Sequence, residues 1–214
     1  MKPVTRYRLA AILLLATPAW AHAQIANPYA KPAAAPSAPQ DKGTKMDDLK
    51  SFATGGAKIL ESTKGDLTGD GRQGAVLIID PPGGENAKLG EGPARDVVLV
   101  VPDATGHLQK AASNLRIVPC ATCGGVAGDP YGYTKVAKGQ FTIVNGGGSR
   151  ERWSDEYTFT WSAARKDWLA SHVVRKVTDS DTGKEKIVDL SAKELGDVPF
   201  KDFDPSHFQE PTLP

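Results

Sequence analysis

The sequence predicts a mainly β protein, with a single antiparallel β domain over residues 46–214 that is built as a sandwich or a curved meander. Short β-branched runs bounded by Gly, Pro and Asp recur along this region, as is typical of strands. Residues 152–162 alternate between aromatic and polar side chains, which indicates a strand with one buried face. No part of the region sustains the 3.6-residue period of an amphipathic helix, so we expect short links between antiparallel strands.

The first 23 residues have the pattern of an export signal peptide. A positively charged start precedes an apolar run at residues 9–16, far shorter than the about 20 apolar residues of a membrane-spanning helix. Ala21, His22 and Ala23 form a small-x-small cleavage site, which favours cleavage before Gln24 over an uncleaved membrane anchor. We therefore expect a periplasmic or secreted protein with no membrane span after signal cleavage.

The net charge of the chain limits the classes of partner that we expect. The full chain has 26 basic and 25 acidic residues, and loss of Lys2, Arg6 and Arg8 with the signal leaves 23 against 25, or −2. A nucleic-acid binder needs a basic face, and a polybasic membrane-surface binder needs a basic cluster. The balance argues against both, so no nucleic acid is expected among the partners.

Residues 24–45 are rich in Pro and Ala and poor in large apolar side chains. Such a segment buries too little apolar surface to offset the entropy lost on ordering, so we interpret it as a disordered linker. A proline-rich docking motif is the alternative, but the aromatic or basic context of such motifs is missing. A short helix is expected at residues 46–52, ended by Gly55 and Gly56.

Six apolar or alternating runs are expected to be the strands of the domain. They lie at residues 75–79, 96–101, 140–144, 152–162, 168–177 and 186–190. On the fourth run the aromatic side chains share one face, and Asp155 is the polar exception on that face. The glycine-rich residues 145–149 predict a wide hairpin turn; a phosphate-binding loop is the alternative, but it normally precedes a helix.

An Asp-Gly turn precedes the first of these strands. Asp66, Thr68 and Asp70, followed by a glycine, match the opening of a calcium-binding loop, with oxygen ligands at positions one, three and five. The later acidic ligands are missing, because positions nine and twelve are glycine and leucine. Two interpretations stay open: a calcium site, or a tight turn whose Asp side chains accept backbone amides. No cofactor other than calcium is expected.

The chain has only two cysteines, Cys120 and Cys123. A thioredoxin-like redox centre needs a helix here, but the glycine-rich residues that follow do not favour one. A zinc site needs two more ligands, and no histidine stands at ligand spacing. Exported proteins usually oxidise two nearby cysteines, so we expect a disulfide that stiffens the loop at residues 116–133, with redox and metal roles as alternatives.

Four residues near this loop and the glycine-rich turn are candidates for binding. Tyr131 and Tyr133 offer contact area with little rotamer entropy to lose, and burial at the edge of the core is the alternative. Arg150 and Arg152 follow the glycines, and ordinary solvated charge is the alternative for both. No catalytic residue is assigned, because the serine elbow, the zinc-protease motif and the Walker loop are missing.

The order of these features resembles that of uncharacterised secreted β-rich proteins of Gram-negative bacteria. The resemblance rests on the Asp-Gly turn at residues 66–71, the Cys-Gly-Gly loop at residues 123–130 and the Gly-rich-to-aromatic stretch at residues 147–159. The turn itself is similar to that of FG-GAP repeats. A looser likeness, at the level of fold, extends to periplasmic immunity proteins and lysozyme inhibitors.

These observations predict a non-enzymatic binding module that recognises another envelope or secreted protein, of the immunity or hydrolase-inhibitor type. We expect loops at one end of the sheet to make the contact. One alternative is a periplasmic thiol-redox or cell-wall-acting enzyme that uses the two cysteines or a carboxylate paired across the sheet. The other alternative is a calcium-stabilised structural protein.

Overall fold

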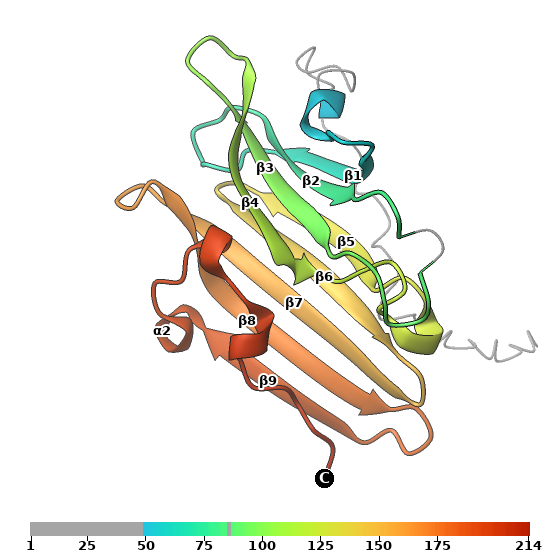
Figure 1. The fold of residues 1–214 in the computed structure, drawn as a ribbon. Helices are drawn as coiled ribbons and strands as arrows, with labels where there is room; N and C mark the ends of the chain where they lie inside the picture. The colour runs from blue at the N-terminus through green and yellow to red at the C-terminus, as the bar shows by residue number, and fades with distance from the viewer. Residues whose placement is uncertain (1–48, 85–86) are drawn as a thin grey trace, which may run out of the picture.

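The computed structural model describes residues 49–84 and 87–214, which form two antiparallel sheets. The first sheet has four strands in the order β1-β2-β3-β4, and the second has five in the order β5-β6-β7-β8-β9. Figure 1 shows the sheets as two layers, with the C-terminal segment lying over β8. The predicted mainly β, antiparallel class is confirmed, while the predicted signal peptide and linker lie outside the described residues.

The strands and helical turns are short and follow one another closely along the chain. The first sheet contains β1 (Lys58–Gly65), β2 (Gly74–Asp80), β3 (Arg95–Pro102) and β4 (Leu108–Val118). The second contains β5 (Tyr131–Ala137), β6 (Gln140–Gly148), β7 (Glu151–Ser162), β8 (Asp167–Asp179) and β9 (Glu185–Ser191). The helical turns are η1 (Lys50–Phe52), η2 (Gly125–Ala127), α2 (Ala192–Leu195), η3 (Phe200–Asp202) and η4 (Pro205–His207).

The six predicted strands correspond to β2, β3, β6, β7, β8 and β9. The three strands that were not predicted, β1, β4 and β5, all lie at sheet edges. Edge strands keep polar and irregular sequences, which hides the alternation that marks a strand. The predicted wide glycine turn is wrong: β6 continues to Gly148, and only Ser149 and Arg150 link it to β7.

The main core lies between the two layers. Val76, Ile78, Val97 and Leu99 of the first sheet belong to the same buried cluster as Phe141, Ile143, Tyr157 and Phe159 of the second. The aromatic face predicted for residues 152–162 is therefore confirmed. The cluster also takes in Phe200 and Phe203 of the C-terminal segment, whose rings meet Phe159 edge-on with centroids 5.2 and 5.1 Å away.

The first sheet is covered on its other face as well. A second buried cluster is formed by Leu49, by side chains of β2 and by side chains of β3. Phe52 packs against this cluster from η1. Burial on both faces explains why β2 and β3 have continuous apolar sequences rather than alternating ones.

The C-terminal segment from Phe200 onward is attached to the sheets by side-chain hydrogen bonds. The Asn114 amide of β4 donates to the carbonyl oxygens of Phe200 and Phe203, at 2.6 and 2.8 Å. The neighbouring Arg116 donates to those of Lys201 and Phe203, at 2.9 and 3.2 Å. Because buried carbonyl groups need donors, these two side chains fix the position of the segment.

The variant Asn114→Ala tests this attachment. Asn114 is 3% exposed, and the change removes a buried hydrogen bond from each of two carbonyl groups, so it should lower the free energy of unfolding by about 1–3 kcal/mol. The measurement is urea unfolding followed by circular dichroism. Gln109→Ala, which removes an exposed amide from the same strand, is the control and should change stability by less than about 0.5 kcal/mol. Equal effects of the two variants would contradict the role given to Asn114.

Candidate functional site

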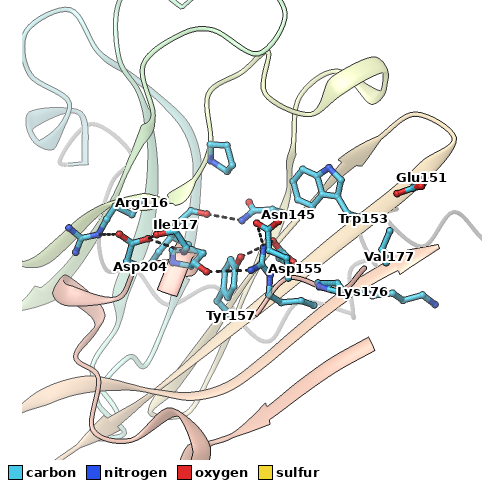
Figure 2. Close-up of a pocket in the computed structure, with 16 residues that line it drawn as sticks. Arg116, Ile117, Asn145, Glu151, Trp153, Asp155, Tyr157, Lys176, Val177 and Asp204 are labelled. Atoms are coloured by element: carbon cyan, nitrogen blue, oxygen red, sulfur yellow. Dashed lines mark hydrogen bonds and ion pairs between the residues drawn. The ribbon is translucent and has the colours of Figure 1, made fainter. Parts of the chain in front are cut away.

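A pocket of about 610 Å³ lies between the second sheet, the end of β4 and the C-terminal segment (Figure 2). Its floor consists of side chains from β6, β7 and β8: Asn145, Trp153, Asp155, Tyr157, Arg175 and Val177. Its walls consist of Arg116, Ile117 and Pro119 on one side and of residues 204–206, Glu210 and Pro211 on the other. The size and the mixed lining are those of a small-ligand or side-chain binding site.

The polar residues of the floor form a row across the sheet. Asn145 of β6 pairs in register with Asp155 of β7, which pairs with Arg175 of β8. Directly paired residues of neighbouring strands point to the same face, so all three project toward the pocket side. The row interrupts an otherwise apolar face, and all three residues are buried.

Asp155 and Arg175 form a buried ion pair. Arg175 Nε lies 3.0 Å from one carboxylate oxygen of Asp155, and Nη2 lies 3.3 Å from the other. The Tyr157 hydroxyl donates to the same carboxylate at 2.8 Å. Burial works against the charge on Arg175, but the hydrogen bonds and charge of Asp155 outweigh it and raise the pKa of Arg175. Burial, together with the nearby Asp155 charge, raises the pKa of Tyr157 and keeps the hydroxyl a donor.

Arg175 also holds the far wall of the pocket. Its Nη1 donates to the carbonyl oxygens of Pro205 and Phe208, at 3.3 and 3.2 Å, and its Nη2 lies 3.4 Å from Glu210. One guanidinium therefore joins the floor to the C-terminal segment. A buried charge with this many acceptors is well compensated. The same contacts hold the wall in one position relative to the floor.

Asn145 is a buried floor residue with one side-chain hydrogen bond made and one acceptor left over. Its Nδ2 donates to the carbonyl oxygen of Ile117 at 2.8 Å, which fixes the orientation of the amide. Its Oδ1 is buried and has no donor within residues 49–84 and 87–214. A buried acceptor without a donor costs about 1–3 kcal/mol, and the burial of this atom closes it off from the open space of the pocket.

Trp153 forms the apolar part of the floor and is partly exposed. Its position depends on the cross-strand residue Gly147, with which it pairs in register. A Cβ atom at Gly147 would lie 2.8 Å from Cζ2 of Trp153 and 2.7 Å from the carbonyl oxygen of Gly124. The absence of a side chain at Gly147 therefore lets both the indole and the cysteine loop approach β6.

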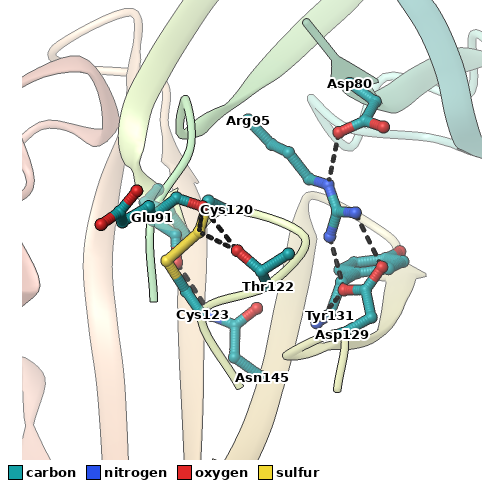
Figure 3. Close-up of polar contacts among 10 residues, drawn as sticks. Asp80, Glu91, Arg95, Cys120, Thr122, Cys123, Asp129, Tyr131 and Asn145 are labelled. Atoms are coloured by element: carbon teal, nitrogen blue, oxygen red, sulfur yellow. Dashed lines mark hydrogen bonds and ion pairs between the residues drawn. A yellow bond between two sulfur atoms is a disulfide. The ribbon is translucent and has the colours of Figure 1, made fainter. Parts of the chain in front are cut away.

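The predicted disulfide between Cys120 and Cys123 is present, with the two Cα atoms 5.1 Å apart. Cys120 is buried, and η2 is a single 3-10 turn in place of the helix that a thioredoxin-like centre requires. The loop rests on β6, because Gly148 donates its amide to Gly124. Figure 3 shows the disulfide beside Glu91 and Thr122.

Arg95 joins the loop to the first sheet and was not predicted to have a role. Its side chain is 1% exposed, and its Nε lies 3.0 Å from Asp80 of β2. Its two Nη atoms lie 2.5 and 2.7 Å from the carboxylate of Asp129, just before β5 (Figure 3). Burial opposes its charge, but Asp129 and Asp80 raise the pKa of Arg95. A bidentate pair of this kind fixes the loop between the layers.

The four predicted binding residues are not brought together. Tyr131 and Tyr133 lie in β5 and not in a loop, which corrects their predicted placement. The Tyr131 hydroxyl bonds to Thr134 at 2.9 Å, and Tyr133 is 7% exposed. Neither lines the pocket. Their part in binding stays a prediction, and the surface that they offer is small.

Arg150 and Arg152 lie at the end of the second sheet, outside the pocket lining. Arg150 Nη2 lies 2.7 Å from Asp179 and its Nε lies 3.1 Å from Asp181, so it ties two neighbouring hairpin turns together. Arg152 has the strand parity opposite to that of Trp153 and therefore projects from the other face of β7. Their predicted binding role is untested, and the geometry of Arg150 is that of a structural link.

The Asp-Gly turn uses its carboxylates internally. Asp66 accepts the backbone amides of Gly69 and Gly71, at 2.7 and 2.8 Å. Asp70 is paired with Arg72 at 2.7 Å, and the hydrogen bonds from Arg72 lower the pKa of Asp70. In the part of the chain that the structure describes, no three His, Cys, Asp or Glu residues are grouped as metal ligands. The geometry is that of an amide-capped turn, and calcium binding at Asp66, Thr68 and Asp70 stays a prediction.

Comparison with known proteins found no match for this chain among family models, curated proteins or solved structures. The resemblance to secreted β-rich proteins therefore stays a prediction, and the function has to be inferred from the site. None of the helices within residues 49–84 and 87–214 has the length and apolar character needed to cross a bilayer.

The variant Asp66→Ala tests the turn. It removes the acceptor of two backbone amides and should lower the free energy of unfolding by about 1–2 kcal/mol, measured by thermal or urea unfolding. The same measurement is repeated with millimolar calcium chloride, with Asp70→Asn as the matched variant. A calcium-dependent rise in the melting temperature that Asp70→Asn abolishes would instead support a calcium site.

The Asp179 carboxylate gives a pH-dependent prediction. Hydrogen bonds from Arg150 and from the amides of Thr182 and Asp181 lower its pKa to about 2. A lowered folded-state pKa stabilises the fold above the unfolded value of about 4, and this contribution is lost as pH falls toward 2. The stability difference between wild type and Asp179→Asn should therefore shrink over that window, and carbon NMR should place the titration midpoint near 2. A midpoint near 4 would contradict the interaction.

Proposed function

We propose that the protein is an exported, non-enzymatic binding module of the periplasm or the extracellular space, of the immunity or hydrolase-inhibitor type. Its partner is another envelope or secreted protein, a portion of which enters the pocket between the second sheet and the C-terminal segment. The observation that carries the proposal is the open pocket of about 610 Å³, whose floor and wall are joined by the buried Arg175.

The construction of the pocket supports binding by a pre-formed surface. Its floor is held by strand pairing and by the Asp155–Arg175 pair, and its walls are tied to β4 and β8 by side-chain hydrogen bonds. A surface that is ordered before the partner arrives loses little entropy on association. The pocket therefore suits recognition without a large rearrangement.

The chemistry of the lining favours recognition over catalysis. Arg175 and the Tyr157 hydroxyl occupy the Asp155 carboxylate, which is the most buried acid of the pocket. The two cysteines, on which a thiol-redox function would depend, are joined to each other, and Cys120 is buried. The described lining contains neither a histidine nor a cysteine side chain. A binding role uses the groups as they stand, whereas a hydrolase or redox role requires that they be released.

Site-specific photo-crosslinking tests the proposal. Benzoylphenylalanine replaces Ser206 on the pocket wall, or Lys138 in the β5–β6 turn at the other end of the second sheet, and the protein is irradiated in envelope extract. We expect a discrete protein adduct from position 206 and not from position 138. Trp153→Ala should reduce the adduct about tenfold, because an aromatic anchor in a pocket dominates such contacts.

Trp161→Ala is the matched control, since Trp161 lies on the same face of β7 but outside the pocket, against Trp168. It should leave the yield of adduct unchanged, provided that the melting temperatures of both variants show a folded protein. No adduct from position 206, or the same adducts from both positions, would count against the pocket as the binding site.

A further inference from the structure

Strand β9 is the outermost strand of the second sheet on the side away from β5 (Figure 1). It pairs with β8 in an unbroken register from Glu185 to Ser191. Alternate backbone N–H and C=O groups of such an outer strand point away from the sheet. Within the described residues, no other segment makes a backbone hydrogen bond to residues 185–191, and only the Ser191 amide is used, by the Glu194 side chain at 2.8 Å. This edge can therefore accept another strand.

The other three edge strands are covered or irregular. Gly65 of β1 packs directly against Val136 of β5, so these two edge strands lie next to each other, and the pairing of each has a register shift. The pairing of β4 shifts at two places, and β4 carries the C-terminal segment through Asn114. Bulges and covering segments protect sheet edges from pairing with other chains. The described β9 has a regular register and no segment hydrogen-bonded along its edge.

The side chains of β9 leave its edge accessible to a strand of similar chemistry. Ile187, in the middle of the strand, is 47% exposed. The two acids of β9 already have partners on β8, because Glu185 lies 2.7 Å from Lys176 and Asp189 lies 2.7 Å from His172. An apolar centre with partnered acids on either side favours pairing between strands over repulsion.

A second copy of β9 fits this edge in one antiparallel register. Because paired residues share a face of the sheet, the twofold axis of such a dimer passes through one residue of the strand. An axis at Val188 pairs all of β9 with its copy. Axes at Ile187 and at Asp189 pair only residues 185–189 and 187–191, and they place Glu185 opposite Asp189 or Asp189 opposite itself. Like charges directly opposite each other are destabilising, so the Val188 axis is favoured.

Apolar side chains meet at the Val188 axis. Val188 lies opposite its own copy on the face that β9 shares with Arg175, since these two residues pair in register. The two Ile187 side chains are diagonal neighbours on the other face. Lys186 lies opposite Leu190, along which its aliphatic stem can pack. No pair of like charges lies directly opposite in this register.

We infer that β9 is a self-association edge, at which a second copy of this chain adds its own β9 and continues the sheet across the twofold axis. One seven-residue strand from each copy makes a small interface, so the dimer is weak and forms at high local concentration. The inference goes beyond the proposed function, because the described lining of the pocket contains no residue of β9. A chain that stays monomeric would leave the proposed function as it is.

Sedimentation equilibrium of the exported chain tests the association, at concentrations from about 1 μM to about 1 mM. We expect a monomer–dimer equilibrium with a Kd on the order of 100 μM. Ile187→Lys should weaken the dimer at least about tenfold, because it places two ammonium groups beside the axis. Leu115→Lys is the matched control: it changes an exposed apolar side chain of β4, in the other sheet, and should leave the Kd unchanged.

Cysteine substitution followed by mild oxidation tests the register. Val188→Cys should give covalent dimers, because Cα atoms directly opposite each other lie about 4.5–5.5 Å apart, within the range of a disulfide. Glu185→Cys is the control on the same strand, since its two copies stand about 20 Å apart in this register and should give none. Cys120 and Cys123 are joined to each other and do not compete.

Three results would overturn the inference. The first is a chain that is monomeric at about 1 mM, where a dimer of the expected affinity predominates. The second is an equal effect of Ile187→Lys and Leu115→Lys, or equal crosslinking of Val188→Cys and Glu185→Cys. The third is an adduct in envelope extract between Val188→Cys and a different protein in place of its copy, which would assign the edge to a strand of that protein.

Discussion

The guanidinium of Arg175, a residue of β8, is buried, and it donates to Asp155 of β7 and to carbonyl groups of the C-terminal segment. On the floor it compensates Asp155, which without it would be a buried unpaired charge. On the wall it satisfies carbonyl groups of a segment that, beyond the single bridge at Pro199, pairs with no strand in the described residues. Both surfaces of the pocket thus share this one side chain, which acts beside Asn114 and Arg116 in holding the segment.

The space under the segment stays open because polar groups keep apolar side chains out of it. Asn145, Asp155 and Arg175 form a polar row at the point where the aromatic cluster of Phe159, Phe200 and Phe203 ends. Collapse of the segment onto this row would bury charged groups more deeply without new partners, which is unfavourable. The boundary between aromatic core and polar row therefore defines where the core ends and the site begins.

The sequence was sufficient to predict the central strands of both sheets. Strands β2 and β3 are buried on both faces and therefore have continuous apolar sequences. Strand β7 is buried on one face and therefore alternates between aromatic and polar residues. The edge strands lacked such a signal, and so did the C-terminal segment, whose attachment depends on side chains such as Asn114 that lie far away in sequence. The disulfide was predictable because the chain, with its predicted export signal, has two cysteines that allow one intramolecular pairing.

The site was only partly visible in the sequence. Asp155 stood out as a charge on an aromatic face, and a buried acid implies a buried cation, but periodicity does not say which one. Register supplies the answer, since Asp155 pairs with Arg175 across β7 and β8. Tyr131 and Tyr133 were favoured because they were expected in a loop stiffened by the disulfide, and residue type does not distinguish a contact surface from the rim of a core.

Gly147 links two parts of the molecule that are otherwise separate. The backbone of the cysteine loop and the indole of Trp153 both occupy the volume that a side chain at this position would fill. The position of the loop that carries the disulfide is therefore coupled to the position of the Trp153 ring on the pocket floor. A bulkier residue at this position would require both the loop and the indole to move. A change in the shape of the loop should therefore be accompanied by a change in the shape of the pocket floor.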